Sequence, residues 1–416
     1  MVKTPLGTPP TQGLKIGIDA TNLRLGGGVT HLIELLGALT PSEHSISEIV
    51  VWGGADTLAR LPSQTWLTKH NPPQLDATLA KRVFWQVFCL SKAARLAGCD
   101  LLFVPGGSYF GTFRPAVVMS QNLLPFEWQE LRRTRFSLFT LKMLILRVVQ
   151  SWSFRHVNGV IFLSQYAKKA VLEVTGPLQA KTAVIAHGLS ARFGLAPKLA
   201  KSINDYGLVN PFQLLYVSNI DAYKHQIAVV LAVQGLREKG YPLHLTLIGP
   251  GSTKPVASLR AVIDQVTALD PKEVAPKEVK PKEVKPKEAW VKYLGVVPYE
   301  DLRAQYAKAD LGLFASSCET FGMILLEKMA MGLPIACSKL SSMQELLADG
   351  GLYFDPVNSS DIAATLERYL LSAELRSQKQ AVSYGLSKAY SWQTCASHTF
   401  TFLSGIAAAF KRQSSP

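Results

Sequence analysis

Two glutamates that lie eight residues apart, Glu319 and Glu327, stand in the segment 314–334, which reads FASSCETFGMILLEKMAMGLP. The pattern predicts a strand that ends near Ser316, a turn through Gly322 and then a helix. The free N–H groups and the positive dipole end at the start of a helix bind anions. Because eight residues make a little over two helical turns, both carboxylates can face one side and accept hydrogen bonds from hydroxyl groups. The segment predicts a site for a ligand that carries hydroxyls and phosphates, although spacing alone equally allows Glu327 to be a solvated helix residue.

A loop lysine follows a second expected strand. The run 216–224, which reads YVSNIDAYK, begins with the apolar end of that strand and ends at Lys224. Taken alone, Lys224 is interpreted as an ordinary solvated loop lysine.

A glycine-rich turn, Gly26-Gly27-Gly28, follows the apolar run at residues 14–20. It is not a dinucleotide-binding fingerprint, because His31 stands in place of the third glycine. Glycines still allow the backbone to come close to a ligand, so the turn is a candidate binding loop. A simple tight turn is the alternative interpretation.

The elements that must position these residues alternate along the chain. Near-continuous apolar runs, typical of strands covered on both faces of a parallel sheet, are separated by longer stretches that can be helical. The runs are residues 14–20, 49–53, 101–104, 116–120, 159–164, 182–186, 212–218, 243–249, 291–295, 311–315, 333–338 and 351–354. The polar stretch 198–211 separates two halves, and each half is predicted to form one doubly wound α/β sheet.

Length and composition bound the class of protein. A chain of 416 residues predicts two or three domains, and a hydrophobic content of 48% excludes wholesale disorder and fibrous repeats. No run approaches the roughly 18 apolar residues of a membrane-spanning helix, and residues 1–13 lack the apolar core of a secretory signal. Five cysteines without a Cys-x-x-Cys pair predict reduced thiols and a cytoplasmic protein. Scattered histidines and the lack of an Asp-x-Asp pair at a strand end predict that no metal is bound.

The net charge of +14 favours partners that carry negative charge. Nucleic acid is disfavoured, because the chain has no zinc-finger, RNP or helix-turn-helix signature. The stretch 131–156 carries basic residues and no acidic residue, and on one continuous helix its basic and apolar residues take opposite faces. Such a helix either packs on its own domain or docks on an anionic membrane surface.

The tripeptide Pro-Lys-Glu recurs at residues 271, 276, 281 and 286. A proline at every fifth position forbids a regular helix or a central strand. The repeat predicts an exposed, extended insertion over residues 270–289, and a partner-binding motif is the alternative.

The segment 314–334 resembles the signature of the family 4 retaining glycosyltransferases, which have the GT-B fold of two Rossmann-like domains facing across a cleft. Their motif is a Glu, seven residues, a second Glu and then Ala-Met-Ala-x-Gly-x-Pro, and here it reads Glu319, Glu327 and KMAMGLP. The similarity continues at residues 344–346, 350–356 and 391–392. It covers residues 212–395 closely and 14–190 more loosely.

The resemblance implies a domain organisation. It predicts a flexible tail at residues 1–13, an N-terminal acceptor domain at 14–205 and a C-terminal nucleotide-sugar domain at 206–390. The last segment, 391–416, is expected to cross back onto the N-terminal domain.

The resemblance also implies roles for single residues. Glu327 would bind the ribose hydroxyls, Glu319 would hold hydroxyls of the transferred sugar, and Lys224 would neutralise the diphosphate. The predicted catalytic residues are Lys224, Glu319 and Gln121. The predicted donor-binding residues are Gly27, Gly28, Ser218, Asn219, Lys224, Val296, Val297, Glu319, Thr320, Phe321, Gly322, Met323 and Glu327.

Two residues depart from the family pattern. Asn219 stands where the family often has an arginine that shares the diphosphate with the lysine, so Lys224 is expected to carry more of that charge. Gln121 stands where many relatives have His-Asp; its amide can hydrogen-bond a sugar hydroxyl but cannot act as a cation or a base. His187 is interpreted as a structural residue rather than a catalyst.

The expected function is that of a retaining, metal-independent glycosyltransferase of the hexosyltransferase type. It would need no cofactor and would move a sugar from a nucleoside-diphosphate sugar to a glycan or lipid-linked acceptor, in cell-surface polysaccharide or lipopolysaccharide synthesis. The expected location is the cytoplasm, or the inner face of the membrane. The alternatives are a non-catalytic scaffold that binds sugar nucleotides or glycans, and a sugar-nucleotide epimerase, for which no convincing acid–base set is present.

Overall fold

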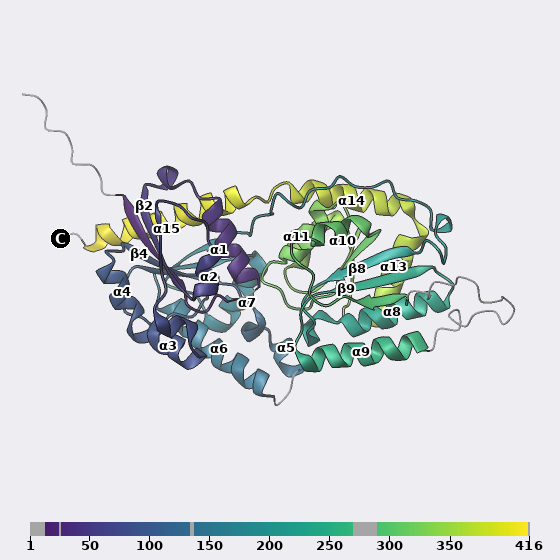
Figure 1. Cartoon of the computed structure of the whole chain (residues 1–416), viewed down its shortest axis with the longest axis horizontal. Coiled ribbons are helices and arrows are strands. Elements are labelled where there is room, and N and C mark those ends of the chain that lie inside the picture. The colour runs from purple at the N-terminus through teal and green to yellow at the C-terminus, as the bar shows by residue number, and fades with distance from the viewer. Residues whose placement is uncertain (1–12, 25, 134–136, 269–288, 415–416) are drawn as a thin grey trace, which may run out of the picture. The chain divides into compact units, whose positions relative to one another are not determined.

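The structure is a computed structural model, and it describes residues 13–24, 26–133, 137–268 and 289–414. The chain divides into two compact units. The N-terminal unit comprises residues 1–188 and 390–416, and the C-terminal unit comprises residues 189–389. Both are α/β units built on a parallel sheet (Figure 1). The predicted tail (residues 1–13) and the predicted Pro-Lys-Glu insertion (residues 270–289) both lie almost wholly outside the described residues.

The N-terminal unit contains a seven-stranded sheet in the order β3-β2-β1-β4-β5-β6-β7. All of its strand pairs are parallel. The strands are β1 (Leu14–Ala20), β2 (Ile46–Gly53), β3 (Leu67–His70), β4 (Leu101–Val104), β5 (Ala116–Ser120), β6 (Gly159–Phe162) and β7 (Lys181–Val184). The central strands β4, β5 and β6 are buried along their whole length, as their apolar runs predict.

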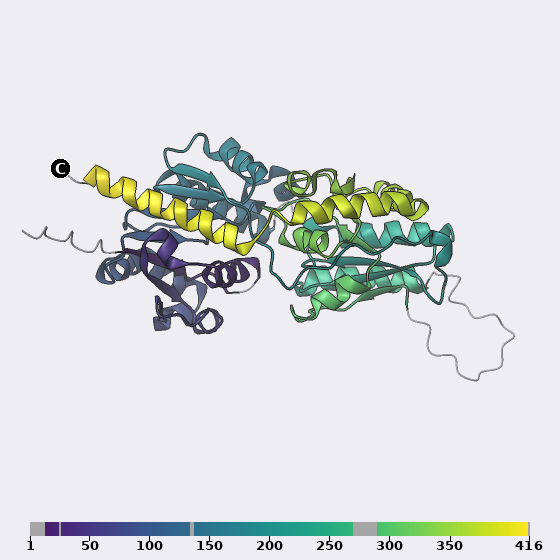
Figure 2. The same cartoon turned by 90° about the horizontal axis from the view of Figure 1, so that it is seen from above.

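Helices cover this sheet, and the last helix of the chain returns to it. They are α1 (Gly27–Gly37), α2 (Ala55–Ala59), α3 (Leu79–Phe88), α4 (Leu90–Leu96), α5 (Trp128–Arg133), α6 (Leu138–Arg155), α7 (Gln165–Thr175) and α15 (Trp392–Ser414). Helix α15, drawn in yellow, runs along the N-terminal unit and packs against α1 and β4 (Figure 2). Gly188 allows its close approach, because a Cβ atom there would lie 2.3 Å from the backbone nitrogen of Trp392.

Residues 131–156 do not form the one continuous helix on which the amphipathic interpretation of this stretch was conditional. The structure has two helices, α5 and α6, and residues 134–136 between them lie outside its described part. Ser137 begins α6 as its N-cap, since the Ser137 hydroxyl accepts a hydrogen bond from the backbone N–H of Thr140 at 3.1 Å.

The C-terminal unit contains a six-stranded sheet in the order β10-β9-β8-β11-β12-β13, again with parallel pairs. The strands are β8 (Phe212–Val217), β9 (Leu243–Ile248), β10 (Val291–Tyr293), β11 (Leu311–Phe314), β12 (Ile335–Ser338) and β13 (Gly351–Phe354). The helices are α8 (Gln226–Glu238), α9 (Thr253–Ala268), α10 (Leu302–Lys308), α11 (Met323–Ala330), α12 (Met343–Leu347), α13 (Ser359–Leu371) and α14 (Ala373–Ser387).

In both sheets the strand order reverses once, between β1 and β4 and between β8 and β11. In doubly wound sheets, ligands bind outside the carboxyl ends of the strands at such a reversal. The fold therefore predicts that ligands bind at the loops that follow these strands. Among the described helices, none combines the length and apolar character needed to cross a bilayer.

Candidate functional site

The candidate site of the C-terminal unit lies at the carboxyl ends of β8 and β11, which are hydrogen-bonded neighbours. The loop after β8 carries Ser218, Asn219 and Lys224, and the loop after β11 carries Glu319 and Gly322. Residues about a hundred positions apart in the sequence are thus brought to one edge of the sheet. This is the reversal point at which a ligand is expected.

Lys224 and Glu319 form a direct ion pair between Nζ and Oε1. The side chain of Lys224 is 7% exposed and that of Glu319 is 18% exposed, so the pair is largely shielded from solvent. A shielded pair interacts more strongly than a surface pair. An incoming anion would meet Lys224 already positioned, with Glu319 beside it.

Hydrogen bonds hold the two loops of the ion pair together. The backbone N–H of Ser317 donates to the carbonyl of Tyr223 at 2.9 Å, and the Tyr216 hydroxyl donates to the carbonyl of Lys224 at 2.6 Å. On the other side, the Ser341 hydroxyl accepts from the N–H of Glu319 and donates to its carbonyl, both at 2.8 Å. The position of the charged pair is therefore set by the fold before any ligand binds.

Glu327 is buried, with 4% of its surface exposed, so it is not the solvated helix residue that spacing alone allowed. The hydroxyls of Tyr299 and Tyr306 donate to its two carboxylate oxygens, at 3.0 Å and 2.9 Å. Burial raises the pKa of Glu327, and the two tyrosine hydrogen bonds oppose that rise. Each oxygen keeps a lone pair with which it can accept from a ligand hydroxyl.

Sequence reasoning missed Lys328, which it quoted only as a letter of the motif. The side chain is fully buried; its ammonium lies 3.5 Å from the carbonyl oxygen of Val217, and 5.0 Å from the centre of the Phe314 ring. Lys224 approaches the same ring at 5.8 Å, so one aromatic side chain contacts both ammonium groups. Burial lowers the pKa of Lys328 to about 7, opposed chiefly by the negative charge of Glu327. The available signal was a lysine beside Glu327 in a helix whose other residues are apolar.

Helix α11 starts beside the ion pair and offers backbone N–H groups. Gly322 is its N-cap and has a φ of 103°, a left-handed conformation that favours glycine. The first hydrogen bond within this helix start is that from the N–H of Leu325 to the carbonyl of Gly322. Thr320, Phe321 and Met323 flank this turn, as the predicted approach of backbone to the donor requires.

Ser218 and Asn219, two further predicted donor contacts, are placed differently. Ser218 is buried, and its hydroxyl accepts a hydrogen bond from the Gln226 side chain at 2.9 Å, so it fixes the loop to α8. Its backbone lies so close to Gly249 that a Cβ atom there would be 2.0 Å from the Ser218 carbonyl oxygen. Asn219 is exposed, which leaves its side chain accessible to solvent.

Val296 and Val297 lie in the loop that follows the edge strand β10. This loop contacts two other elements. The carbonyl of Gly295 accepts a hydrogen bond from the N–H of Gly249 after β9, and the Tyr299 hydroxyl donates to Glu327 on α11. Val296 is 71% exposed on this loop. An exposed apolar side chain above the carboxyl ends of the strands suits a flat base, as the resemblance implies.

In the N-terminal unit the structure brings Gly28 and Gln121 together. A Cβ atom on Gly28 would lie 3.0 Å from the Gln121 side-chain oxygen, and the two residues follow β1 and β5. Gly27 is the first residue of α1. The glycine turn and the amide of Gln121, which were predicted separately as ligand contacts, thus lie next to each other at the carboxyl edge of the sheet.

A buried histidine pair lies in the same unit. The Nδ1 atoms of His31 and His187 are 2.9 Å apart, and both rings pack against Trp392 at the start of α15. Burial lowers the pKa of His31 to about 4, and burial together with the neighbouring His31 lowers that of His187. The two imidazoles thus pack beneath the start of α15, and the interpretation of His187 as a structural residue rather than a catalyst stays a prediction.

One cavity of about 420 Å³ lies in the C-terminal unit, away from the site just described. Phe212 and Gln213 line it at the amino end of β8, together with Tyr206 and Arg376. The Arg376 guanidinium donates to backbone carbonyls of Leu370 and Lys201, so it anchors the chain segment beside the cavity. Among the described residues, no group of three His, Cys, Asp or Glu side chains is arranged to hold a metal ion.

Comparisons with known proteins agree with this arrangement. Residues 201–384 match the family model of glycosyl transferases group 1, a match that lies within the C-terminal unit. The O-antigen chain mannosyltransferase B of Escherichia coli is 36% identical over 110 residues, which are 26% of this chain and 29% of that protein. A glycogen synthase of Mycobacterium tuberculosis is 24% identical over 258 residues, 61% of this chain and 56% of that protein. The matched regions thus span less than two thirds of these relatives.

Solved structures match over nearly the whole chain. Anabaena HepE in complex with UDP and glucose has a TM-score of 0.66 at 18% identity, covering 94% of this chain and all of that one. Sucrose-phosphate synthase from Thermosynechococcus elongatus has a TM-score of 0.72 at 15% identity, covering 95% and 100%. The predicted fold class is confirmed: two parallel-sheet α/β domains that match GT-B glycosyltransferase structures. The match to the group 1 family model covers less than half of the chain, and the solved structures show its fold.

Proposed function

We propose that this protein is a retaining glycosyltransferase of family 4 that moves a sugar from a nucleoside-diphosphate sugar to an acceptor hydroxyl. The observation that carries the proposal is the arrangement of Lys224, Glu319 and Glu327 at the reversal point of the C-terminal sheet. A shielded cation, helix N–H groups and two carboxylates suit a ligand that has both a diphosphate and hydroxyl groups.

Each group has a distinct task in the proposed reaction. Lys224 and the first N–H groups of α11 stabilise the charge that develops on the departing diphosphate. Glu319 accepts hydrogen bonds from hydroxyls of the transferred sugar, and Glu327 accepts from those of the ribose. The bond between the anomeric carbon and the phosphate oxygen breaks, and the acceptor oxygen attacks from the same face. The departing phosphate takes the acceptor's proton, so no protein base is required.

In this proposal the cationic lysine and the helix dipole neutralise the leaving group, and neither a metal ion nor a cofactor takes part. Lys224 is held by Glu319 and by the hydrogen bonds of its loop, which orient it before the donor binds. Preorganised charge of this kind costs no reorganisation during the reaction. Turnover in the presence of a chelator tests this part of the proposal.

The proposed acceptor is a lipid-linked glycan in cell-surface polysaccharide or glycolipid synthesis, on the cytoplasmic face of the membrane. The similarity to an O-antigen mannosyltransferase and the net charge of +14 support it. A non-catalytic sugar-nucleotide scaffold is the second candidate, favoured by the exposed Asn219 in place of an arginine.

The proposal is tested with a panel of UDP-, GDP- and ADP-sugars, scored for thermal shift and for release of nucleoside diphosphate. An active transferase is stabilised by its donor and slowly hydrolyses it, faster when glycolipid acceptor is added. Stabilisation without any release, with or without acceptor, would favour the scaffold. Release that survives Lys224→Met or Glu319→Gln unchanged would refute the assigned roles.

A further inference from the structure

Large apolar side chains are exposed on one group of helices in the N-terminal unit. More than half of the exposed large apolar residues in the described part of the chain lie on α3, α4, α5 and α6. On α6, Leu138 is 87% exposed and Val148 is 69% exposed, and Leu141 and Ile145 are each more than half exposed. Soluble proteins rarely leave so much apolar surface in one region without a partner.

The exposed residues of α6 form one face. Leu138, Leu141, Ile145, Val148 and Trp152 follow each other at steps of three and four, which places them along one side of a helix. The other side of α6 buries Met143, Gln150 and Phe154, and the helix packs against α7 and the turn Leu124–Phe126. The sequence left open whether the apolar side of this stretch packs on its own domain or docks on a membrane, and in the structure these side chains of α6 are exposed.

The loop 105–113, which follows β4, contacts α3 and α4 as well as α6 and so links these helices. The Gln86 side chain on α3 donates to the carbonyl of Ser108, and Ser91 on α4 accepts from the N–H of Thr112 at 2.9 Å. From α6, the Ser153 hydroxyl accepts from the N–H of Tyr109 at 2.8 Å, and the Trp152 ring stacks on Phe110.

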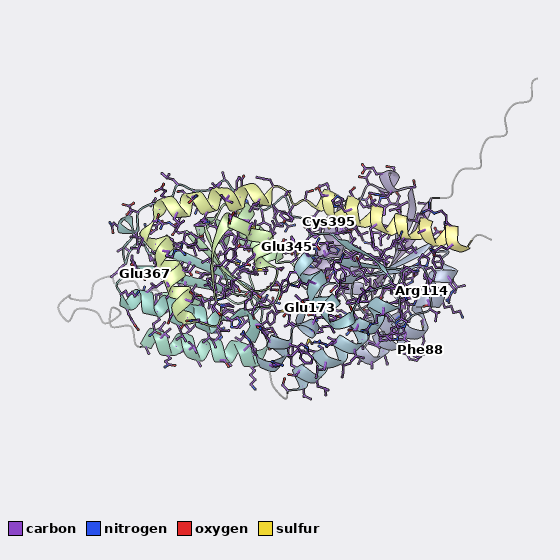
Figure 3. All side chains as sticks on the ribbon, turned by 180° about the vertical axis from the view of Figure 1, so that it is seen from behind. Phe88, Arg114, Glu173, Glu345, Glu367 and Cys395 are labelled. Atoms are coloured by element: carbon purple, nitrogen blue, oxygen red, sulfur yellow. The ribbon has the colours of Figure 1, made fainter. Side chains whose placement is uncertain are left out.

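Helices α3 and α4 add to the same side of the unit. On α3, Phe84 and Phe88 are exposed and their rings are 4.9 Å apart. Figure 1 draws α3, α4 and α6 along one edge of the N-terminal unit, and Phe88 lies at that edge in Figure 3. We call the exposed residues of α3 and α6 the apolar surface.

The helices that carry the apolar surface bear charges of a single sign. The stretches 77–99 and 137–172, which contain α3, α4 and α6, include no aspartate or glutamate. Lys81, Arg82, Lys92, Lys142 and Arg147 lie on these helices. The Arg147 guanidinium stacks over the exposed Trp128 ring at 4.1 Å, an amphipathic pair of the kind that suits a membrane interface.

We propose that the apolar surface docks this protein on an anionic lipid bilayer, with α6 lying in the plane of the interface. Apolar side chains would enter the boundary between headgroups and acyl chains, and the basic residues beside them would contact the acidic headgroups. The positive charge favours an anionic bilayer over a second copy of the chain, because two copies of the same basic surface would repel each other. The inference rests on the proposed function in one respect, since a lipid-linked acceptor would be presented at such a surface.

The test is flotation of the full chain with phosphatidylcholine vesicles, with and without phosphatidylglycerol. We expect binding to vesicles that contain phosphatidylglycerol, weaker binding as salt rises, and little binding to phosphatidylcholine alone. The variant Leu141→Asp/Val148→Asp changes two exposed positions and is expected to lose at least tenfold in the bound fraction. Its matched control is Leu199→Asp/Val209→Asp, which changes two still more exposed apolar residues of the C-terminal unit and should bind like the parent chain.

Three results would overturn the docking proposal: no flotation on anionic vesicles, equal flotation of both double variants, or a dimer in solution that Leu141→Asp/Val148→Asp dissociates. The last result would assign the surface to a second copy of the chain. Donor hydrolysis in detergent-free buffer separates this test from the proposed function. A chain that floats but releases no diphosphate from any donor would refute the enzyme and leave the docking surface intact.

Discussion

The two reversal points of this molecule are built from different chemistry. In the C-terminal unit, four ionisable side chains gather near the ends of β8 and β11: Lys224, Glu319, Glu327 and Lys328. In the N-terminal unit, the corresponding edge offers a glycine turn and the neutral amide of Gln121. The imidazoles nearby are buried, and burial keeps them uncharged at neutral pH.

The difference indicates a division of labour between similar folds. A diphosphate needs fixed positive charge, and in the proposed reaction the C-terminal unit would supply it together with carboxylates that hold hydroxyls. A neutral sugar or glycan needs shape and hydrogen bonds, and the N-terminal unit supplies a close backbone and an amide. Substitutions at the edge of the C-terminal sheet should therefore affect both the chemical step and donor binding. Substitutions at the edge of the N-terminal sheet should affect both only weakly.

The largest effect is expected at the ion pair. Lys224→Met removes the cation from the leaving group, and Glu319→Gln removes the carboxylate that orients it, so each should lower kcat by roughly 10²–10³-fold. The measurement is nucleoside diphosphate release with a saturating donor.

Lys239→Met is the matched control for these variants, because Lys239 pairs with Glu367 on the surface of the same unit (Figure 3). Surface pairs contribute little, so its kcat should equal that of the parent chain. Equal losses in all three variants would mean that the C-terminal unit has been destabilised, and the comparison between charged and neutral edges would fail.

Glu327→Gln should mainly raise the KM for the donor. The amide keeps the volume of the side chain, but one of its two ends donates where the Tyr299 and Tyr306 hydroxyls need an acceptor. Losing a hydrogen bond to a charged group costs about 1.5–3 kcal/mol, or roughly 10- to 150-fold in KM. Steady-state kinetics with varied donor check this, and a fall in kcat at unchanged KM would place Glu327 in the chemical step instead.

Much of this arrangement could be predicted from the sequence. The strand runs were found because strands buried on both faces are continuously apolar, and Glu319 and Glu327 stood out through their spacing and motif. Strand β3 was missed, since Leu67–His70 is a short edge strand with two basic residues and pairs only with β2.

What the sequence could not provide are contacts between distant residues. The tyrosines that bury Glu327 lie 28 and 21 positions from it, and Lys224 lies 95 positions from Glu319. The direction of the apolar face of α6 was equally hidden, because periodicity identifies a face but not what covers it.

Lys328 makes stability depend on pH in a way that the N-terminal unit should not share. Its pKa is about 7 in the fold and near 10.5 when exposed, so between these values the unfolded chain holds a proton that the folded chain has released. The free energy of unfolding should therefore rise with pH over this window, by at most about 1.4 kcal/mol per pH unit.

Lys328→Met removes this dependence and keeps the length of the side chain. In urea unfolding at several pH values between 7 and 10, the free energy of unfolding of the parent chain should rise relative to that of the variant as pH increases. Other groups titrate alike in both proteins, so they cancel in the difference. A constant difference over the window would mean that Lys328 stays charged in the fold.

The smallest effect is expected at the neutral edge. Gln121→Ala removes one neutral hydrogen bond, worth about 0.5–1.5 kcal/mol, so transfer to the acceptor should fall by roughly 2- to 12-fold. Gly28→Ala places a methyl group 3.0 Å from the Gln121 side-chain oxygen, and its effect should come from displacing that amide. In that case Gly28→Ala adds nothing once Gln121 is alanine, a non-additivity that a double-mutant cycle measures. Gly37→Ala, in open space at the end of α1, is the control. Additive losses would mean that the Gly28 backbone contacts the ligand on its own, and losses above 100-fold would make the N-terminal edge part of the chemistry.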